Sequence, residues 1–278
     1  QNRSMYTEYQ PSHLLVPYID SYWEFKGNPD YGMRIHILPD GCTDFIFTLG
    51  EVANAVEEGS LIMQPYRSYF VGPMTKYSEL VTYTESIHMF GVRFLPCGLS
   101  CFTNLPLHEF VNSRVSTNEM KAVFDDTFIE KLGEQKHVTD RIRVVEEYLL
   151  AYLARHYQPA DSHVAMAVNM INHSKGKRSV RSLMDDVCLC QRHFERKFKH
   201  YTGFTPKEYS RIVKFKNAVE LLRTTTSANL LTTAVDAGYY DLAHFSKEIK
   251  SMSGNTPASF LSLTVPEETT LTYIEPQR

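Results

Sequence analysis

The sequence has few cysteines and no long apolar run, and each shortage excludes a class of protein. No stretch approaches the roughly 20 apolar residues that span a bilayer, and the N-terminus lacks the charged-then-apolar layout of a secretory signal. The five cysteines form an odd set without any C-x-x-C pair, which argues against a disulfide framework and against a zinc ribbon. We therefore expect a cytoplasmic protein with reduced thiols and no membrane segment.

The histidine spacing of common metal sites is missing as well. There is no H-x-H and no H-x-x-x-H pattern. The side chains that could be imagined as ligands in a cupin-like barrel are His36, Cys42, Asp44, Glu85 and His88. Because their spacing is poor, we expect no metal, no other cofactor and no catalytic residue. A metal-dependent enzyme on the barrel would need the ligand cluster that this pattern lacks.

Charge is distributed unevenly along the chain. Residues 174–262 contain 15 basic and 8 acidic side chains, whereas residues 1–173 contain 13 basic and 21 acidic ones. A basic module attached to an acidic one indicates a polyanionic partner for the basic module. Solvated lysines alone would give the same count, so the charge needs support from a motif.

The first hundred residues have the pattern of short strands. Aromatic and β-branched runs such as SYWEF, MRIHIL, DFIFTL and HMFGVRF are separated by Gly and Pro, which favours a β-sandwich or small barrel. Pro39 and Gly41 fit a turn, so we expect a hairpin that joins residues 33–38 to residues 43–49.

Helical periodicity replaces this pattern from about residue 116. In residues 139–157 the apolar side chains recur at helical intervals, and Thr139 or Asp140 can cap the start. The apolar face of this helix could serve dimerisation or pack against its own domain. Further helices follow almost to residue 262, and Thr205, Pro206 and Glu208 form a capping box at the start of one of them.

One stretch of the C-terminal half occurs twice, at an offset of 51 residues. HFERKFKHYTGFTP at 193–206 aligns with HFSKEIKSMSGNTP at 244–257, and six of the fourteen positions are identical. A repeat of this length indicates a supersecondary unit that is used twice. Each copy consists of a short helix, a tight break and a second helix, which is the layout of a helix-turn-helix.

The second helix of each copy has an apolar seam opposite a polar face. The seam residues are Phe194, Phe198 and Tyr201 in the first copy and Phe245, Ile249 and Met252 in the second. On the polar face, an arginine such as Arg196 can bond to guanine and Glu195 can accept from cytosine. A solvated face on a helical bundle is the simpler explanation of either helix alone. Duplication together with positive charge favours two helices that read successive major grooves.

Residues 161–262 closely resemble the DNA-binding domain of the AraC/XylS family of bacterial transcription regulators, which contains two helix-turn-helix units joined by a long helix. The residues that carry the resemblance lie in GYYDLAHFSKEIKSMSGNTPASF and, in the first copy, in RHFERKF and TGFTP. The chain departs from the family at Cys188-Leu189-Cys190, where glycine and a serine cap are commoner. The resemblance implies sequence-specific binding of double-stranded DNA in adjacent major grooves. The residues that it implies for contact with DNA are Gln191, Arg192, Glu195, Arg196, Lys199, Leu242, Ala243, His244, Lys247 and Lys250.

Residues 5–110 also resemble one N-terminal variety of this family, through EYQPS, SYWEF, LPDGCTDFIF, VGPMT and FGVRFLPCG. The family commonly uses such a domain to sense a small molecule. The candidates for effector binding are Trp23, Phe45 and Arg93, although aromatic side chains must fill the core of a barrel in any case and Arg93 can pair with a carboxylate of the protein.

The sequence thus predicts a multidomain α and β chain. A β-rich effector-sensing domain at 5–115 precedes a helical linker at 116–160, a double helix-turn-helix domain at 161–263 and a tail at 264–278. The predicted function is a DNA-binding transcription regulator, an activator rather than a repressor, with a small-molecule effector, a homodimer and RNA polymerase as further partners. The rival predictions are a metal-dependent cupin-type enzyme and an alkyl-accepting repair protein. The latter would need a four-cysteine zinc site that these cysteines do not supply.

Overall fold

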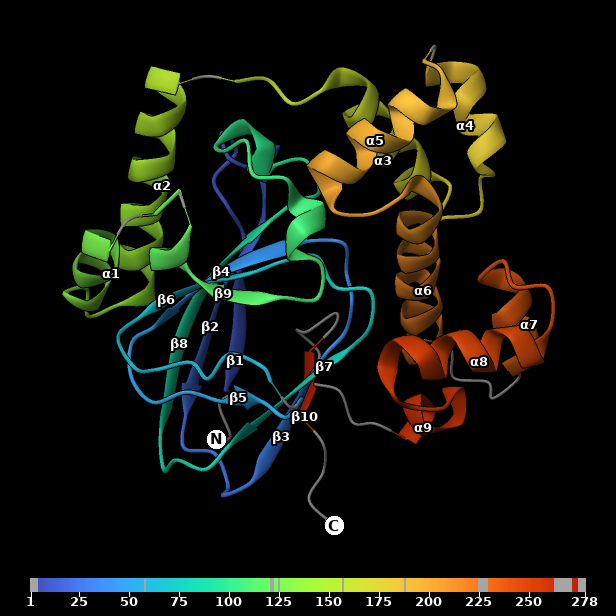
Figure 1. Cartoon of the computed structure of the whole chain (residues 1–278). Helices are drawn as coiled ribbons and strands as arrows, with labels where there is room; N and C mark the ends of the chain where they lie inside the picture. The colour runs from blue at the N-terminus through green and yellow to red at the C-terminus, as the bar shows by residue number, and fades with distance from the viewer. Residues whose placement is uncertain are drawn as a thin grey trace.

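A computed structural model describes residues 5–57, 59–120, 123–124, 126–156, 158–187, 189–224, 230–262 and 272–274. The N-terminal half forms two antiparallel sheets, and the C-terminal half is built from helices that lie beside them (Figure 1). The predicted fold class, a β-rich N-terminal domain followed by an all-α C-terminal domain, is confirmed.

The larger sheet contains six strands in spatial order. These are β1 (Tyr6–Tyr9), β2 (Ile19–Gly27), β8 (Ile87–Phe94), β4 (Thr43–Thr48), β6 (Ser68–Val71) and β9 (Arg114–Ser116). The smaller sheet contains β10 (Thr272–Ile274), β3 (Met33–Ile37), β7 (Ser78–Thr82) and β5 (Asn54–Ala55). Strand β10 comes from the segment that the sequence predicted only as a tail, and it pairs with β3.

Alternation along the strands produces two separate cores on the two faces of the larger sheet. Phe45 and Phe47 on β4 are fully buried among aromatic side chains that face helices α1 (Asp126–Gly133) and α2 (Val138–His156). Ile46, between them, points to the other face and packs with residues of the smaller sheet. The larger sheet is therefore a middle layer, covered by helices on one face and by strands on the other.

The predicted hairpin between residues 33–38 and 43–49 is wrong. Strand β3 pairs with β7 and β10, whereas β4 pairs with β6 and β8, so the two segments belong to different sheets. A turn is nevertheless present at Gly41, which has a φ of 87°. The chain turns there to cross between the sheets, and a Cβ at Gly41 would lie 2.7 Å from the ring of Tyr209 in the C-terminal half.

Helix α2 packs against its own domain. Val145 and Leu149 are fully buried in the core on the helix-covered face of the larger sheet. The helix begins at Val138, so Thr139 and Asp140 lie in its first turn and do not cap it. Of the two roles that the sequence left open for the apolar face, packing within the domain accounts for its most buried residues.

The C-terminal half contains seven described helices. These are α3 (Ser162–His173), α4 (Val180–Val187), α5 (Gln191–Thr202), α6 (Pro206–Thr224), α7 (Leu230–Asp236), α8 (Leu242–Ser253) and α9 (Pro257–Ser262). The long helix α6 runs between the pair α4–α5 and the pair α7–α8 (Figure 1). Within the described residues, no helix is both long enough and apolar enough to cross a membrane.

The predicted capping box starts α6. The hydroxyl of Thr205 accepts from the backbone N–H of Glu208 at 3.2 Å, and a Glu208 carboxylate oxygen accepts from the N–H of Thr205 at 2.8 Å.

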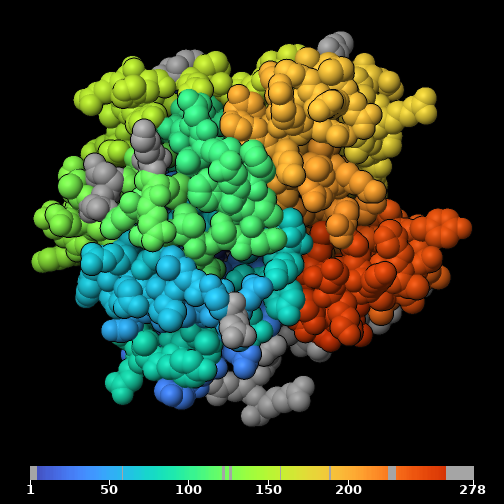
Figure 2. All heavy atoms as spheres, viewed as in Figure 1, coloured from blue at the N-terminus to red at the C-terminus, as the bar shows by residue number. Residues whose placement is uncertain are grey.

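Leu38 and Cys97, from the N-terminal half, are buried in the core of the helical half. The two halves therefore share a packed boundary, which Figure 2 shows as a continuous contact between the cyan and green segments and the orange and red ones.

Candidate nucleic-acid interface

The two copies of the repeat have the same frame, by which we mean the length and bounds of the second helix and the residues that end it. Helices α5 (Gln191–Thr202) and α8 (Leu242–Ser253) each have 12 residues and begin and end at the same 51-residue offset. Each is followed by a glycine in the left-handed region, Gly203 with a φ of 83° and Gly254 with a φ of 76°. Glycine reaches this conformation at little cost and commonly ends a helix in this way.

The hydroxyl at the last position of each helix makes the same bonds in both copies. Thr202 Oγ1 donates to the Phe198 carbonyl at 2.7 Å, and Ser253 Oγ donates to the Ile249 carbonyl at 2.7 Å. Each hydroxyl also accepts the N–H two residues later, at 3.2 Å in the first copy and 3.1 Å in the second. The conservative pairing of Thr202 with Ser253 in the sequence therefore reflects one shared C-terminal cap.

The apolar seams hold both helices in the core. Phe194 and Phe198 of α5 and Phe245 and Ile249 of α8 have no exposed side-chain surface. Tyr201 is half-buried. Because each seam is anchored, the opposite face of each helix is fixed in direction without any support from a ligand.

Most side chains that the sequence predicted as DNA contacts lie on those opposite faces. Nine of the ten are exposed and one is half-buried, and they lie in two groups, one on each helix. The exposed nine are Gln191, Arg192, Arg196, Lys199, Leu242, Ala243, His244, Lys247 and Lys250, and the half-buried one is Glu195. The structure thus brings each group together on one accessible surface, on either side of α6.

Neighbouring side chains orient several members of these groups. Gln191 Nε2 donates to Glu195 Oε1 at 2.8 Å, one helical turn away. Arg196 Nη2 lies 3.3 Å from His193 Nδ1. In the second copy the ring of His244 meets the ring of Tyr239 edge-on, with centroids 5.4 Å apart. Arg196 and His244 remain exposed, so the guanidinium and imidazole groups can still bond to a partner.

The two copies differ at the start of the reading helix. The Asp241 side chain caps α8 by accepting from the His244 N–H at 2.7 Å. Cys190 occupies the matching place before α5, where no side chain caps the helix. The departure from the family pattern at Cys190 therefore corresponds to a missing cap, and Cys188 lies outside the described residues.

An ion pair joins α8 to the long helix. Arg211 on α6 donates from Nε to Glu248 Oε1 at 2.7 Å, and this bond raises the pKa of the Arg211 guanidinium. Glu248 is largely buried and lies on the inner side of α8. The acidic residue of this helix is thus neutralised within the domain, while Lys247 and Lys250 beside it remain exposed.

The three effector candidates lie in the closed interior of the β-rich half. Phe45 is fully buried, and Trp23 donates from Nε1 to Asp44 at 2.7 Å. Arg93 lies 3.3 Å from Glu8, 3.5 Å from Asp40 and 3.3 Å from Asp44. Burial raises the pKa of the Asp44 carboxyl, and the Arg93 charge opposes that rise. Arg93 thus pairs with carboxylates of the protein, which is the simpler of its two predicted roles.

Two of the residues considered as metal ligands form ion pairs with other side chains of the protein. His88 pairs with Glu24 at 2.9 Å, and Asp44 pairs with Arg93. Across the part of the chain that the structure describes, no three His, Cys, Asp or Glu side chains form a group that could hold a metal ion.

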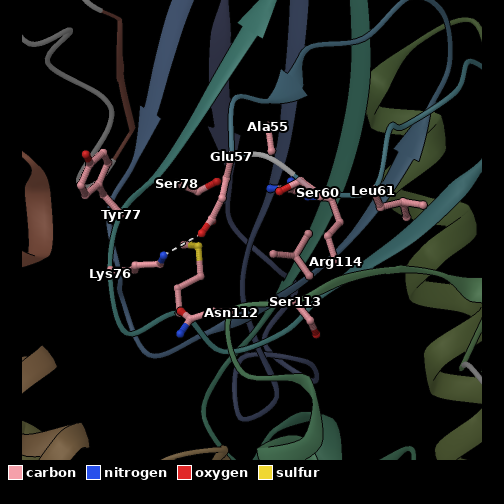
Figure 3. Close-up of a pocket in the computed structure, with 13 residues that line it drawn as sticks. Ala55, Glu57, Ser60, Leu61, Lys76, Tyr77, Ser78, Asn112, Ser113 and Arg114 are labelled. Carbon is pink, nitrogen blue, oxygen red and sulfur yellow. Dashed lines mark hydrogen bonds and ion pairs between the residues drawn. The ribbon is translucent and has the colours of Figure 1, made fainter.

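A pocket that the sequence did not predict opens at one end of the β-sandwich. Its polar residues include Glu57, Ser60, Lys76, Ser78, Asn112 and Arg114, and we call it the rim pocket (Figure 3). These residues come from separate segments, and no periodicity in the sequence marks Arg114. The one signal was the family motif VGPMT, which ends immediately before Lys76.

Two family models match the chain. Residues 7–116 match a domain of unknown function, DUF6597, and residues 183–262 match a helix-turn-helix domain. No curated protein matches the sequence. The second match covers α5, α6 and α8, so a helix-turn-helix domain over residues 183–262 is confirmed, whereas the bounds 161–263 stay a prediction.

Solved structures include a protein of the same architecture. The structure of ToxT from Vibrio cholerae shares 10% sequence identity over 88% of this chain and 100% of that chain, with a TM-score of 0.52. The xylose-binding transcription activator xylR matches 39% of this chain and 28% of its own at 24% identity, with a TM-score of 0.34. The C-terminal domain of AraT, a response regulator from Geobacillus stearothermophilus, matches 39% of this chain and 92% of its own at 20% identity, with a TM-score of 0.35.

The helix-turn-helix match supports a DNA-binding transcription regulator, and the likeness to ToxT shows a shared fold. The sequence resembles the AraC/XylS family through the motifs of the duplicated unit, in GYYDLAHFSKEIKSMSGNTPASF, RHFERKF and TGFTP. That resemblance is confirmed for the C-terminal region: the chain carries an AraC-type helix-turn-helix domain behind a DUF6597 domain, in a two-domain fold like that of ToxT.

Proposed function

We propose that the protein is a sequence-specific transcription regulator whose helices α5 and α8 read two successive major grooves of one duplex. The observation that carries the proposal is the exposure of both predicted reading faces on two copies of one frame. Helix α6 has 19 residues and is about 28 Å long at roughly 1.5 Å per residue. With its flanking turns it can separate the reading helices by about the 34 Å of one DNA turn.

In this proposal the base edges are contacted by the first four predicted residues of each helix. These are Gln191, Arg192, Glu195 and Arg196 on α5 and Leu242, Ala243, His244 and Lys247 on α8. Lys199 and Lys250 contact phosphates and fix the register. Arginine forks onto guanine, and a small alanine permits contact with a thymine methyl group.

Residues 5–115 would sense a small molecule and residues 161–263 would bind DNA. A ligand that favours one arrangement of the two halves would shift the population between DNA-binding and non-binding states. We propose activation as the outcome, with RNA polymerase and a second copy of the chain as further partners in the cytoplasm.

Selection of bound duplexes from a random pool tests the proposal. The expected result is a motif in two blocks about one helical turn apart, with an affinity that falls steeply as salt rises because phosphates are contacted. A chain that selects no sequence, or whose binding is insensitive to salt, would contradict it. Metal analysis of the purified chain tests the enzyme alternative, since stoichiometric zinc or iron would revive a metal-dependent reaction on the sandwich.

A further inference from the structure

The rim pocket has the size of a small-molecule site. Its volume is about 390 Å³, within the range of about 300–1,000 Å³ that ligand pockets occupy. It lies between strands β6 and β9 of the larger sheet and β5 and β7 of the smaller one. Figure 2 shows this face of the molecule hollowed between green, blue and cyan segments, beside the boundary with the C-terminal helices.

Arg114 gives the pocket a positive charge. Its Nε atom is buried and has no hydrogen-bond partner within the described part of the chain. Burial lowers the pKa of the Arg114 guanidinium, and the Asp44 charge opposes that effect. A buried N–H donor without a partner is costly, and a carboxylate or phosphate fits the planar fork of donors of a half-buried arginine.

A second cation lies at the pocket mouth. Lys76 Nζ pairs with Glu57 at 2.9 Å, and the two side chains are 51% and 65% exposed (Figure 3). An ion pair this exposed contributes little stability, so Lys76 can exchange Glu57 for another anion. Val71 and Leu61 add apolar wall, which suits an organic ligand better than a bare inorganic ion.

The pocket wall is bonded to the loop at residues 72–77. The Asn112 side chain accepts from the Thr75 N–H and donates to the Thr75 hydroxyl, both at 2.8 Å. The Asn112 N–H donates to the Pro73 carbonyl at 2.8 Å, and the Gly72 N–H donates to the Ser113 carbonyl at 3.0 Å. Because Asn112 lies two residues before Arg114, a ligand on Arg114 acts on the segment that holds this loop.

The same loop contacts both reading helices at matching places. A Cβ at Gly203, after α5, would lie 2.5 Å from Pro73 Cγ, and a Cβ at Gly254, after α8, would lie 2.7 Å from Tyr77 Cζ. Tyr77 lies on the side of the pocket away from Arg114 and packs against the core of the helical half (Figure 3). One loop of six residues therefore touches the C-terminal cap of each copy of the repeat.

We infer that the rim pocket binds a small organic anion, whose carboxylate or phosphate is held by Arg114 and Lys76, and that the 72–77 loop transmits its presence to α5 and α8. The transmission rests on the proposed function, whereas the binding does not. The pocket belongs to the β-rich domain and is distinct from the closed interior that contains Trp23, Phe45 and Arg93.

Calorimetric titration of the full chain tests the binding. The probes are benzoate, hexanoate and phenyl phosphate, with benzamide, hexanamide and phenol as their uncharged counterparts. We expect at least one anion to bind at one site with a Kd below about 1 mM, and its uncharged counterpart to bind at least about tenfold more weakly. Arg114→Gln should weaken that anion about tenfold or more, Lys76→Gln by a smaller factor, and Arg67→Gln, on an exposed arginine outside the pocket, not at all.

Several results would overturn the inference: no binding by any of the three anions, equal binding of acid and amide, or unchanged affinity in Arg114→Gln. If Arg114→Gln fails to fold by circular dichroism, Lys76→Gln and the charge-retaining Arg114→Lys give the answer. In that case we expect weaker binding in the former and partial retention in the latter, and full wild-type affinity in Lys76→Gln would contradict the site.

A second measurement separates binding from transmission. The bound anion should change the affinity of the full chain for its selected duplex, and the duplex should change the anion affinity by the same factor. Pro73→Ala, outside the pocket lining, should keep the anion affinity but reduce that change. An anion that binds without any effect on DNA affinity would refute transmission alone, and a chain that selects no DNA would refute the proposed function while the titration stands.

Discussion

The two copies of the helix-turn-helix unit share their buried packing and their C-terminal caps, whereas their exposed faces match only in part. Their seams, final hydroxyls and terminal glycines correspond at an offset of 51 residues. Their outward faces share Lys199 with Lys250 but differ at Arg192, which corresponds to Ala243, and at Glu195, which corresponds to Ser246. Most of the shared features hold the two helices in place, so the comparison teaches that the copies have the same packing and cap but present different outward side chains.

The largest expected effect concerns the shared seam. Phe198 and Ile249 occupy matching positions and are both fully buried. Replacing either with alanine should lower the free energy of unfolding by about 2–5 kcal/mol, because a cavity remains in a packed core. Urea unfolding of both variants measures this. A loss under about 1 kcal/mol in one copy only would break the equivalence of the two frames.

The terminal glycines should give the next largest effect. Gly203→Ala and Gly254→Ala place a side chain in the left-handed region and against the 72–77 loop, so each should cost about 1–3 kcal/mol. Thermal unfolding measures the loss. Gly133→Ala, where an added Cβ meets open space, is the matched control. Equal stability of wild type and both variants would show that neither position is constrained.

The exposed faces should affect DNA and not stability. Arg196 and Lys247 also occupy matching positions, and both are exposed. Alanine at either position should cost about 1–3 kcal/mol of specific binding in a gel-shift assay and leave urea unfolding unchanged. Lys26→Ala, on the β-rich half, serves as the control. Wild-type affinity for the selected duplex in both variants would remove these two residues from the reading surface.

The smallest effect concerns the N-terminal cap, which α8 has and α5 lacks. Asp241→Ala should cost about 1 kcal/mol because the N-cap of α8 is lost, whereas Cys190→Asp should stabilise the chain by a similar amount because α5 gains one. Thermal unfolding of the two single variants measures both signs. Destabilisation by Cys190→Asp would mean that the α5 start cannot adopt the capped geometry of α8.

Much of the helical half could be predicted from the sequence because its information is local. The repeat placed α5 and α8, and the Thr205 and Glu208 pattern placed the start of α6. The sandwich was harder, since Pro39 and Gly41 signal a turn but not which sheet the next strand joins. That choice depends on distant partners of β3 and β4 and on the space that Tyr209 requires.

The candidate sites also differ in how far the sequence could predict them. The residues proposed to contact DNA could be predicted because helical spacing and a family motif place them together. Arg114 was not found, because its environment is assembled from strands far apart in the sequence and its buried Nε becomes visible only when they pack.

Selection of DNA sequences with three proteins tests the central claim most directly. The wild-type chain should select two blocks of conserved bases about one helical turn apart. Arg196→Ala should lose base preference in one block, and Lys247→Ala should lose it in the other. A single block, or loss of preference in the same block by both variants, would contradict the account in which α5 and α8 read successive grooves of one duplex.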